Sequence, residues 1–304
     1  MWLKEHKSMI MPVAMLIGIL TCNILSKVPF LIPICLFMML FLAYCALDFR
    51  RLRITKINII MLTTHFFLII GLYLLTKLLF GKMIAVSALL CVICPASASS
   101  SAVVFALGGN KETCITHIIL DNIFVTIFAP IMLSYVVPTA NVHIAASMLK
   151  IFNHIMPILI LPLVIVIFLR RIRPKIADKI AQYQWTSLIF WSICLMVIFA
   201  QTTFMIIHCN KEQIHEVLIM ASTSLMICII QFTLGKIIGK KLHRPIAIGQ
   251  GLAQKNTSLG IWLANAYANN PLSIVFSAGY SLWQNIFNSW QMFYHDKKMK
   301  NKKS

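Results

Sequence analysis

Apolar residues follow one another in blocks of about twenty along the chain, and short polar segments rich in lysine and arginine separate the blocks. A helix of about twenty apolar residues is long enough to cross the ~30 Å hydrocarbon core of a bilayer. The pattern therefore predicts an all-α polytopic membrane protein with ten transmembrane helices. The predicted spans are residues 8–26, 29–48, 57–80, 83–108, 114–137, 145–169, 185–207, 215–239, 246–268 and 271–293.

The composition agrees with this fold class and argues against an ordinary soluble protein. Hydrophobic residues make up 60% of the 304 residues and charged residues only 12%, too few to form a polar shell around a core of this size. The segments between the blocks are short. The sequence therefore predicts a single membrane domain over residues 1–304, with no second soluble domain.

The positive charge is concentrated at the ends of the apolar blocks. The net charge is +19, and segments such as "RRIRPK" and "GKKLHR" carry much of it. If successive spans alternate in direction, 21 of the 27 basic residues fall on one side of the membrane, five fall on the other, and Lys255 lies within a span. The positive-inside rule then places both termini in the cytoplasm. We expect a cytoplasmic (inner) membrane, contact with lipid headgroups and no nucleic-acid partner.

The chain shows a weak internal repeat. "MIMPVAMLIGIL" at residues 9–20 and "HIMPILILPLVI" at residues 154–165 share Ile-Met-Pro followed by an apolar run. An odd number of spans in each half forces the two halves into opposite orientations in the membrane. Inverted repeats of this kind are typical of secondary transporters. The predicted repeats are residues 1–140 and 141–304, with five spans each.

Two predicted spans, the fourth of each half, are interrupted. Span 4 contains "CPASASSSA", in which Pro95 removes a backbone hydrogen-bond donor. Span 9 contains "GQGLAQKNTS", in which we expect Gly249 and Gly251 to loosen the helix. Paired interruptions at corresponding places in the two halves indicate a transport site. The polar residues at these breaks are Ser97, Ser99, Ser100, Ser101, Gln250, Gln254, Lys255, Asn256, Thr257 and Ser258.

These two stretches resemble the bile acid:sodium symporter family. "CPASASSSAVVFALGGN" is similar to a Cys-Pro segment of the family that ends in Gly-Asn, and "QKNTSLGIWLA" is similar to its Gln-Asn-Ser-Gly-Leu-Ala segment. The resemblance covers nearly the whole chain. It implies a core domain of spans 3–5 and 8–10, a panel domain of spans 1, 2, 6 and 7, and crossed, interrupted spans 4 and 9. It also implies organic anions bound between the domains, with two sodium sites behind the crossing.

The sequence departs from the family at the positions that bind sodium. Ser100 and Ser101 replace a Ser-Asn pair, Asp121 and Val125 replace a serine and a threonine, and Lys255 replaces a glutamine. Span 9 also lacks the glutamate that the family's two sodium sites share. Hard cations need several oxygen ligands, preferably including a carboxylate. The departures argue against sodium coupling, and we expect no cofactor and no metal.

Asp121 is the only acidic residue deep in a predicted span. Intramembrane charges are costly and are usually paired. We therefore expect a buried Asp121–Lys255 pair in which the ammonium takes the place of a sodium ion. A pair that opens and closes could load and release a proton, which would give proton coupling. A permanent salt bridge that only joins spans 5 and 9 is the structural alternative.

Other polar residues in the spans receive structural interpretations. Gln284 and Asn288, with Asn285 beside them, are expected to form interhelical hydrogen bonds, with substrate contact as a secondary role. Asn122, next to Asp121, is a further secondary site residue. The histidines His65, His117 and His154 are isolated in the sequence and are interpreted as structural or interfacial.

Together these features predict a secondary transporter of a small organic anion, a carboxylate, that works by alternating access. Asp121 and Lys255 would supply charge compensation or coupling, and the polar residues at the breaks would contact substrate or hold the crossing. A cation/proton antiporter and a membrane ligand sensor that moves no substrate are the alternatives. We find no nucleophile–base pair, metal cluster or phosphate-binding loop in the sequence, so an enzyme is not expected. The oligomeric state is left open.

Overall fold

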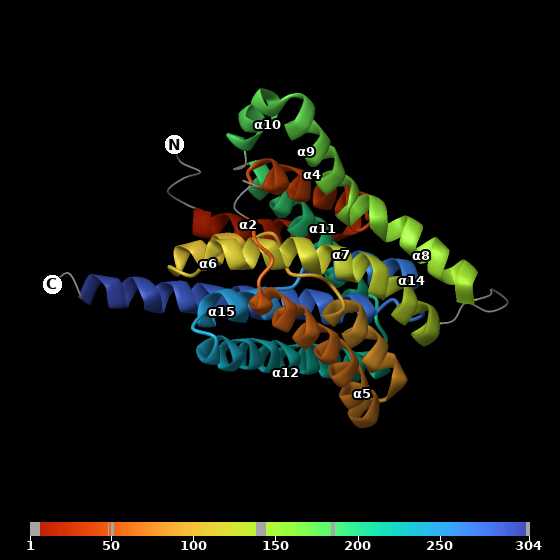
Figure 1. Ribbon diagram of the computed structural model, residues 1–304. Coiled ribbons are helices and arrows are strands. Elements are labelled where there is room, and N and C mark those ends of the chain that lie inside the picture. Colours follow the sequence, from red (N-terminus) through yellow and green to blue (C-terminus); the bar gives the residue numbers. More distant parts are fainter. Residues whose placement is uncertain (1–6, 48, 50–51, 138–143, 184–185, 302–304) are drawn as a thin grey trace.

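The computed structural model describes residues 7–47, 49, 52–137, 144–183 and 186–301, and every named secondary-structure element within them is a helix (Figure 1). The predicted boundary between the repeats, near residue 140, lies outside the described residues. The first helices are α2 (Lys7–Leu20), α3 (Cys22–Leu25), α4 (Leu31–Cys45), α5 (Lys56–Val92), α6 (Ser100–Ala106) and α7 (Lys111–Val136). The later helices are α8 (Ile144–Leu159), α9 (Leu161–Ile172), α10 (Pro174–Ala181), α11 (Ser187–Ile207), α12 (Lys211–Lys241), α13 (Pro245–Ala253), α14 (Thr257–Tyr267) and α15 (Ser273–Asn301).

Local sequence explains where several of these helices begin and bend. Asn110 accepts a hydrogen bond from the Thr113 backbone N–H at 2.8 Å and so caps the start of α7. Gly81 has φ 83° and ψ 176° and breaks the run of α5, between the predicted third and fourth spans. A residue with a side chain rarely adopts this conformation, so glycine is favoured there.

Four described helices are long and apolar enough to cross a membrane: α5, α7, and most of α11 and α12. The bent pair α8 and α9, which meet at 44°, would make a fifth. The prediction of an all-α membrane protein is confirmed at this level. The other predicted spans correspond to short helices, to broken helices or, for residues 271–293, to the long helix α15, and none of these passes the same test of length and hydropathy within the described residues.

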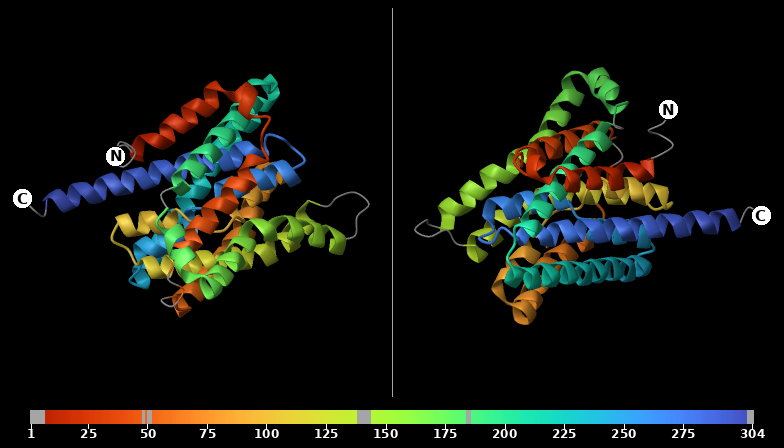
Figure 2. Two further views of the ribbon diagram at one scale, coloured as in Figure 1. Left: turned by 90° about the horizontal axis from the view of Figure 1, so that it is seen from above. Right: turned by 180° about the vertical axis from the view of Figure 1, so that it is seen from behind.

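The helices pack in layers (Figures 1 and 2). Helices α2, α4, α9 and α11 lie together on one side, and α5 and α12 lie on the opposite side. Helices α7, α14 and α15 lie between these groups, with α15 extending well beyond the others at its C-terminal end. Side chains such as Leu20, Leu78 and Phe105 are 82%, 83% and 70% exposed. Apolar surface of this extent is expected where helices face lipid.

Candidate functional site

The two interrupted helices cross at their breaks. The chain leaves α5 after Val92 and enters α6 at Ser100, and it leaves α13 after Ala253 and enters α14 at Thr257. Ala96 and Lys255 form an isolated antiparallel β-bridge. The Ser97 N–H donates to the Gln254 carbonyl at 2.8 Å, and the Asn256 N–H donates to the Pro95 carbonyl at 2.9 Å. Each broken helix thus satisfies backbone groups of the other, which permits non-helical backbone at membrane depth.

The glycines of span 9 do not mark its break, which corrects the sequence prediction. Gly249 and Gly251 both lie inside α13, and non-helical backbone begins only at Gln254. A Cβ on Gly235 of α12 would lie 2.8 Å from the Gly249 Cα. Gly235 and Gly249 therefore let α12 and α13 approach closely, whereas Gly251 lies against Met61 of α5 and His117 of α7. A sequence pattern cannot distinguish this packing role from helix breaking.

Side chains from α15 hold the second break. Gln284 accepts a hydrogen bond from the Lys255 N–H at 2.9 Å and donates to the Lys255 carbonyl at 3.3 Å. One helical turn further along, Asn288 accepts from the Gln250 side chain at 2.9 Å. The predicted interhelical hydrogen bonds of Gln284 and Asn288 are confirmed.

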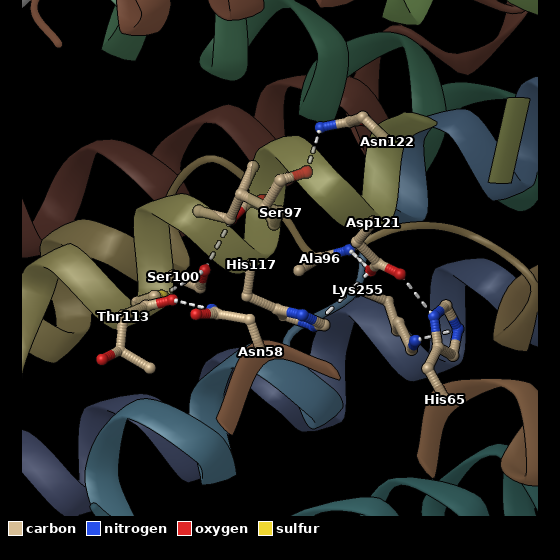
Figure 3. A network of polar contacts seen from close by, with 12 residues as sticks. Asn58, His65, Ala96, Ser97, Ser100, Thr113, His117, Asp121, Asn122 and Lys255 are labelled. Carbon is tan, nitrogen blue, oxygen red and sulfur yellow. Dashed lines mark hydrogen bonds and ion pairs between the residues drawn. The ribbon is translucent and has the colours of Figure 1, made fainter. Parts of the chain in front are cut away.

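Asp121 lies at the centre of a buried polar cluster (Figure 3). Its side chain is fully buried, and its two oxygens have different partners. Oδ1 lies 2.6 Å from Nδ1 of His65, and Oδ2 accepts a hydrogen bond from the Ala96 N–H at 2.7 Å. His117, one turn before Asp121 on α7, places Nε2 3.8 Å from Oδ2. The carboxylate therefore links α5, α7 and the backbone of the first break.

His65 lies between Asp121 and Lys255. The ammonium nitrogen Nζ of Lys255 lies 2.6 Å from Nε2 of His65, and Lys255 is only 1% exposed. Within the described part of the chain, no ion pair joins Asp121 directly to Lys255. The predicted direct pair is therefore replaced by an Asp121–His65–Lys255 chain of contacts, which we call the charge relay (Figure 3).

His65 is not isolated, which corrects the sequence prediction, since its ring contacts both Asp121 and Lys255. The sequence did carry a signal, because an ionisable residue inside an apolar block is a candidate functional residue. What the sequence could not supply was its partner, since His65 precedes Asp121 by 56 residues and Lys255 by 190. Only the packing of α5 against α7 and the crossing brings the three together.

The contacts of the His65 ring permit two arrangements of protons. Nδ1 donates to the Asp121 carboxylate, whereas Nε2 faces both the Lys255 amine and the Val92 carbonyl, the latter at 3.0 Å. A neutral ring can accept a hydrogen bond from the Lys255 ammonium. A protonated ring can instead donate to the Val92 carbonyl, with Lys255 neutral. The two arrangements differ by the position of one proton and leave the net charge of the relay unchanged.

A cavity with a volume of about 330 Å³ lies next to the crossing. Another cavity, of about 440 Å³, lies away from the crossing at one end of the bundle. Helices α4, α6, α11 and α15 enclose the cavity next to the crossing together with Gln254. Four residues predicted for the site line it: Ser99, Ser101, Gln254 and Asn288. The other lining residues are Met39, Ala43, Ala98, Ala102, Val103, Ser187, Trp191, Asn285, Ser289 and Met292.

The remaining predicted site residues lie around the crossing rather than along this cavity. Asn256 accepts a hydrogen bond from the Leu259 N–H at 3.3 Å and caps α14. Ser100 donates to the Ser97 carbonyl at 2.7 Å, and Asn122 donates to the Tyr44 hydroxyl at 3.1 Å. Pro95, Thr257 and Ser258 are buried at the breaks.

These features define a multi-pass helical membrane protein with a polar crossing of two broken helices at its centre. A family model described as the Sodium Bile acid symporter family matches residues 33–209, more than half of the chain. The protein therefore belongs to this family and is a membrane transporter of the bile acid symporter type. The match includes His65, the first break and Asp121, whereas the second break with Lys255 lies beyond it. A search among curated proteins returns no match.

Proposed function

We propose that the protein is a secondary transporter of a small organic anion, a carboxylate, coupled to protons rather than to sodium. The observation that carries this proposal is the buried charge relay at the crossing. A carboxylate, an imidazole and an amine are in contact at membrane depth, where unpaired charge is expensive and ionisable groups usually have a function. Buried ion pairs contribute little to stability, so a purely structural role explains the relay less well.

The proposed architecture has ten spans in two inverted repeats, residues 1–140 and 141–304, in the cytoplasmic membrane with both termini in the cytoplasm. Short helices combine into spans: α2 with α3, the end of α5 with α6, α8 with α9, and α13 with α14. The core domain would comprise α5–α7 and α12–α15, and the panel domain α2–α4, α8, α9 and α11. The separate packing of α2, α4, α9 and α11 in one layer supports this division.

In this proposal, the ammonium of Lys255 takes the place of the sodium ion that would otherwise be bound behind the crossing. The backbone bridge to Ala96 positions Lys255 at the crossing, and its ammonium contacts His65. A second cation in the same low-dielectric space would be repelled strongly. When the relay holds its proton, the positive charge on Lys255 or His65 therefore makes sodium binding unnecessary for balancing the charge of Asp121 and of an anionic substrate nearby.

Proton coupling adds a third arrangement to the two that the contacts of His65 permit, in which the relay has released one proton and both His65 and Lys255 are neutral. In the proposed cycle, movement of the core against the panel changes the contact between Lys255 and His65. A proton that enters from one side in one state can then leave toward the other side in the next. The proton is thus exposed to the two sides of the membrane in turn, as a substrate is in alternating access. His65 would hold the proton between the Asp121 carboxylate and the Lys255 amine.

The cavity supports a small, partly apolar substrate. Its volume of about 330 Å³ lies at the lower end of the usual range for small-molecule sites. Among its described lining residues none is charged, and they include the polar Ser99, Ser101 and Gln254 as well as the large, mostly apolar Met39 and Trp191. Hydroxyl and amide donors suit a carboxylate group, and the apolar surface suits a short hydrocarbon body.

Thermal unfolding of the purified protein tests this proposal. The midpoint would be measured with a panel of carboxylates from pyruvate to cholate, in sodium or in potassium buffer. A ligand bound only by the folded state raises the midpoint in proportion to RT ln(1 + [L]/Kd), so millimolar binders are detectable. A shift with a carboxylate that is equal in both buffers supports the proposal, and a shift that requires sodium contradicts it.

Flux measurements separate the remaining alternatives. In liposomes containing the protein, counterflow of a labelled carboxylate that binds identifies a transporter. Binding without flux would identify a ligand sensor. Proton release on addition of a cation, with no anion present, would identify a cation/proton antiporter.

A further inference from the structure

A further cavity lies at the corner where α9 meets α10, away from the crossing. Its volume is about 870 Å³, and three elements contribute to it: the end of α4 with the residues that follow, the end of α9, and α10. The lining comprises Ala46, Leu47, Phe49, Ile167, Arg170, Arg171, Pro174, Asp178 and Ala181. The proposed function gives this cavity no role.

Arg170 is held rigidly at the wall of this cavity. One terminal nitrogen of its guanidinium, Nη2, donates to the Cys45 carbonyl at the end of α4 at 2.5 Å. The other, Nη1, lies 3.4 Å from Oδ1 of Asp178. Its Nε is buried and has no hydrogen-bond partner among the described residues. The guanidinium is thus fixed in position while one N–H donor is left unsatisfied.

The charges of the lining residues favour binding of an anion with a single negative charge. Arg170 and Arg171 contribute two positive charges and Asp178 one negative charge, so the described lining has a net charge of about +1 by simple count. The segment around it, "RRIRPKIADK", adds Arg173, Lys175 and Lys179 and no further acid. An anion with one charge and several acceptor oxygens, such as a phosphodiester, matches this arrangement.

Apolar surface continues from the cavity along the same helices. Ile167, Phe168 and Ile172 of α9 are 48%, 60% and 67% exposed, and Ile176 of α10 is 47% exposed. A small soluble anion would make no contact with this apolar surface, whereas the acyl chains of a lipid would pack against it. We infer that the cavity binds the phosphate of an anionic phospholipid through Arg170 and Arg171, with the acyl chains along the exposed face of α9.

The test measures thermal unfolding of the full chain in detergent with added lipid. Phosphatidylglycerol should raise the midpoint, whereas phosphatidylcholine and inorganic phosphate should each leave it nearly unchanged. Arg171→Gln should weaken the effect of phosphatidylglycerol about tenfold or more in concentration, because one charge-assisted hydrogen bond is lost. Arg171 is exposed, so this variant is expected to fold, unlike Arg170→Gln, which would also leave the Cys45 carbonyl without its donor.

Arg53→Gln is the matched control, since Arg53 is an exposed arginine that does not line the cavity. It should respond to phosphatidylglycerol as the unmodified protein does. Three results would each overturn the inference: no response of the unmodified protein to phosphatidylglycerol, an equal response to inorganic phosphate, or an unchanged response of Arg171→Gln. Because the readout is lipid binding, these results are independent of whether the protein carries a carboxylate.

Discussion

The ring nitrogen Nε2 of His65 lies 2.6 Å from the ammonium nitrogen of Lys255, and both side chains are buried. Two basic groups at this distance cannot both carry a full positive charge without strong repulsion in a low-dielectric interior. One of them must therefore accept the hydrogen bond. Since Asp121 binds the other ring nitrogen, the state of His65 depends on both neighbours at once.

Two replacements of His65 should have different effects: one lowers the stability of the fold, and the other removes proton coupling while the protein stays folded. His65→Ala removes the contact that joins Asp121 and Lys255, so the buried Lys255 ammonium loses its contact with His65 and Asp121 keeps only the Ala96 N–H and the more distant His117. The free energy of unfolding should fall by about 3–5 kcal/mol. His65→Gln retains hydrogen-bonding groups but cannot carry a proton at neutral pH. It should fold and bind substrate yet lose proton-dependent transport. Binding by thermal shift and flux in liposomes, measured on both variants, check these outcomes.

Asp121 and Lys255 should depend on each other although they are not in direct contact. Lys255→Ala leaves Asp121 with less positive charge nearby and should destabilise the protein by about 3–5 kcal/mol or abolish transport. The double variant Asp121→Asn/Lys255→Gln removes both charges and should recover part of the lost stability. A double-mutant cycle on unfolding midpoints measures this coupling. Strictly additive effects would show that the relay does not act as a unit.

Close packing of α12 on α13 should make Gly235 intolerant of a side chain. The Cβ of Gly235→Ala would lie 2.8 Å from the Gly249 Cα and 3.1 Å from the Ile248 carbonyl oxygen, both backbone atoms. The helices would have to move apart, at a cost of about 1–3 kcal/mol. Gly71→Ala is the control, because no described atom lies within 4 Å of its added Cβ. Equal unfolding midpoints for the two variants would show that the close approach is not required.

The cavity next to the crossing should lose affinity when Ser99 loses its hydroxyl. Ser99 lines the cavity, and its hydroxyl accepts a hydrogen bond from the Gln254 side chain at 2.8 Å. Ser99→Ala should weaken binding of a carboxylate about threefold to tenfold, the effect of one hydrogen bond of about 0.5–1.5 kcal/mol. Ser134→Ala is the control, since the Ser134 hydroxyl bonds to its own helix at the Ile131 carbonyl. If both serine variants bound carboxylates equally, Ser99 would have no part in the site.

The sequence predicted the breaks and their polar residues because proline, hydroxyl groups and an intramembrane lysine are local signals. Pro95 and the residues after it, and Gln254 to Asn256, do form the two crossing segments. The position of His65 could not be predicted, since it depends on how α5 packs against residues far along the chain. For the same reason Gly249 and Gly251 were assigned to the break, although both pack helix against helix.

Transport driven by an imposed gradient in liposomes tests the central claim most directly. The labelled substrate would be the carboxylate that gives the largest thermal shift, and uptake would be driven either by a proton gradient or by a sodium gradient. We predict accumulation when the outside is acidic, without any sodium, and loss of this pH dependence in His65→Gln. Uptake that requires a sodium gradient and ignores the proton gradient would contradict the proposal that the Asp121–His65–Lys255 relay has replaced the coupling ion.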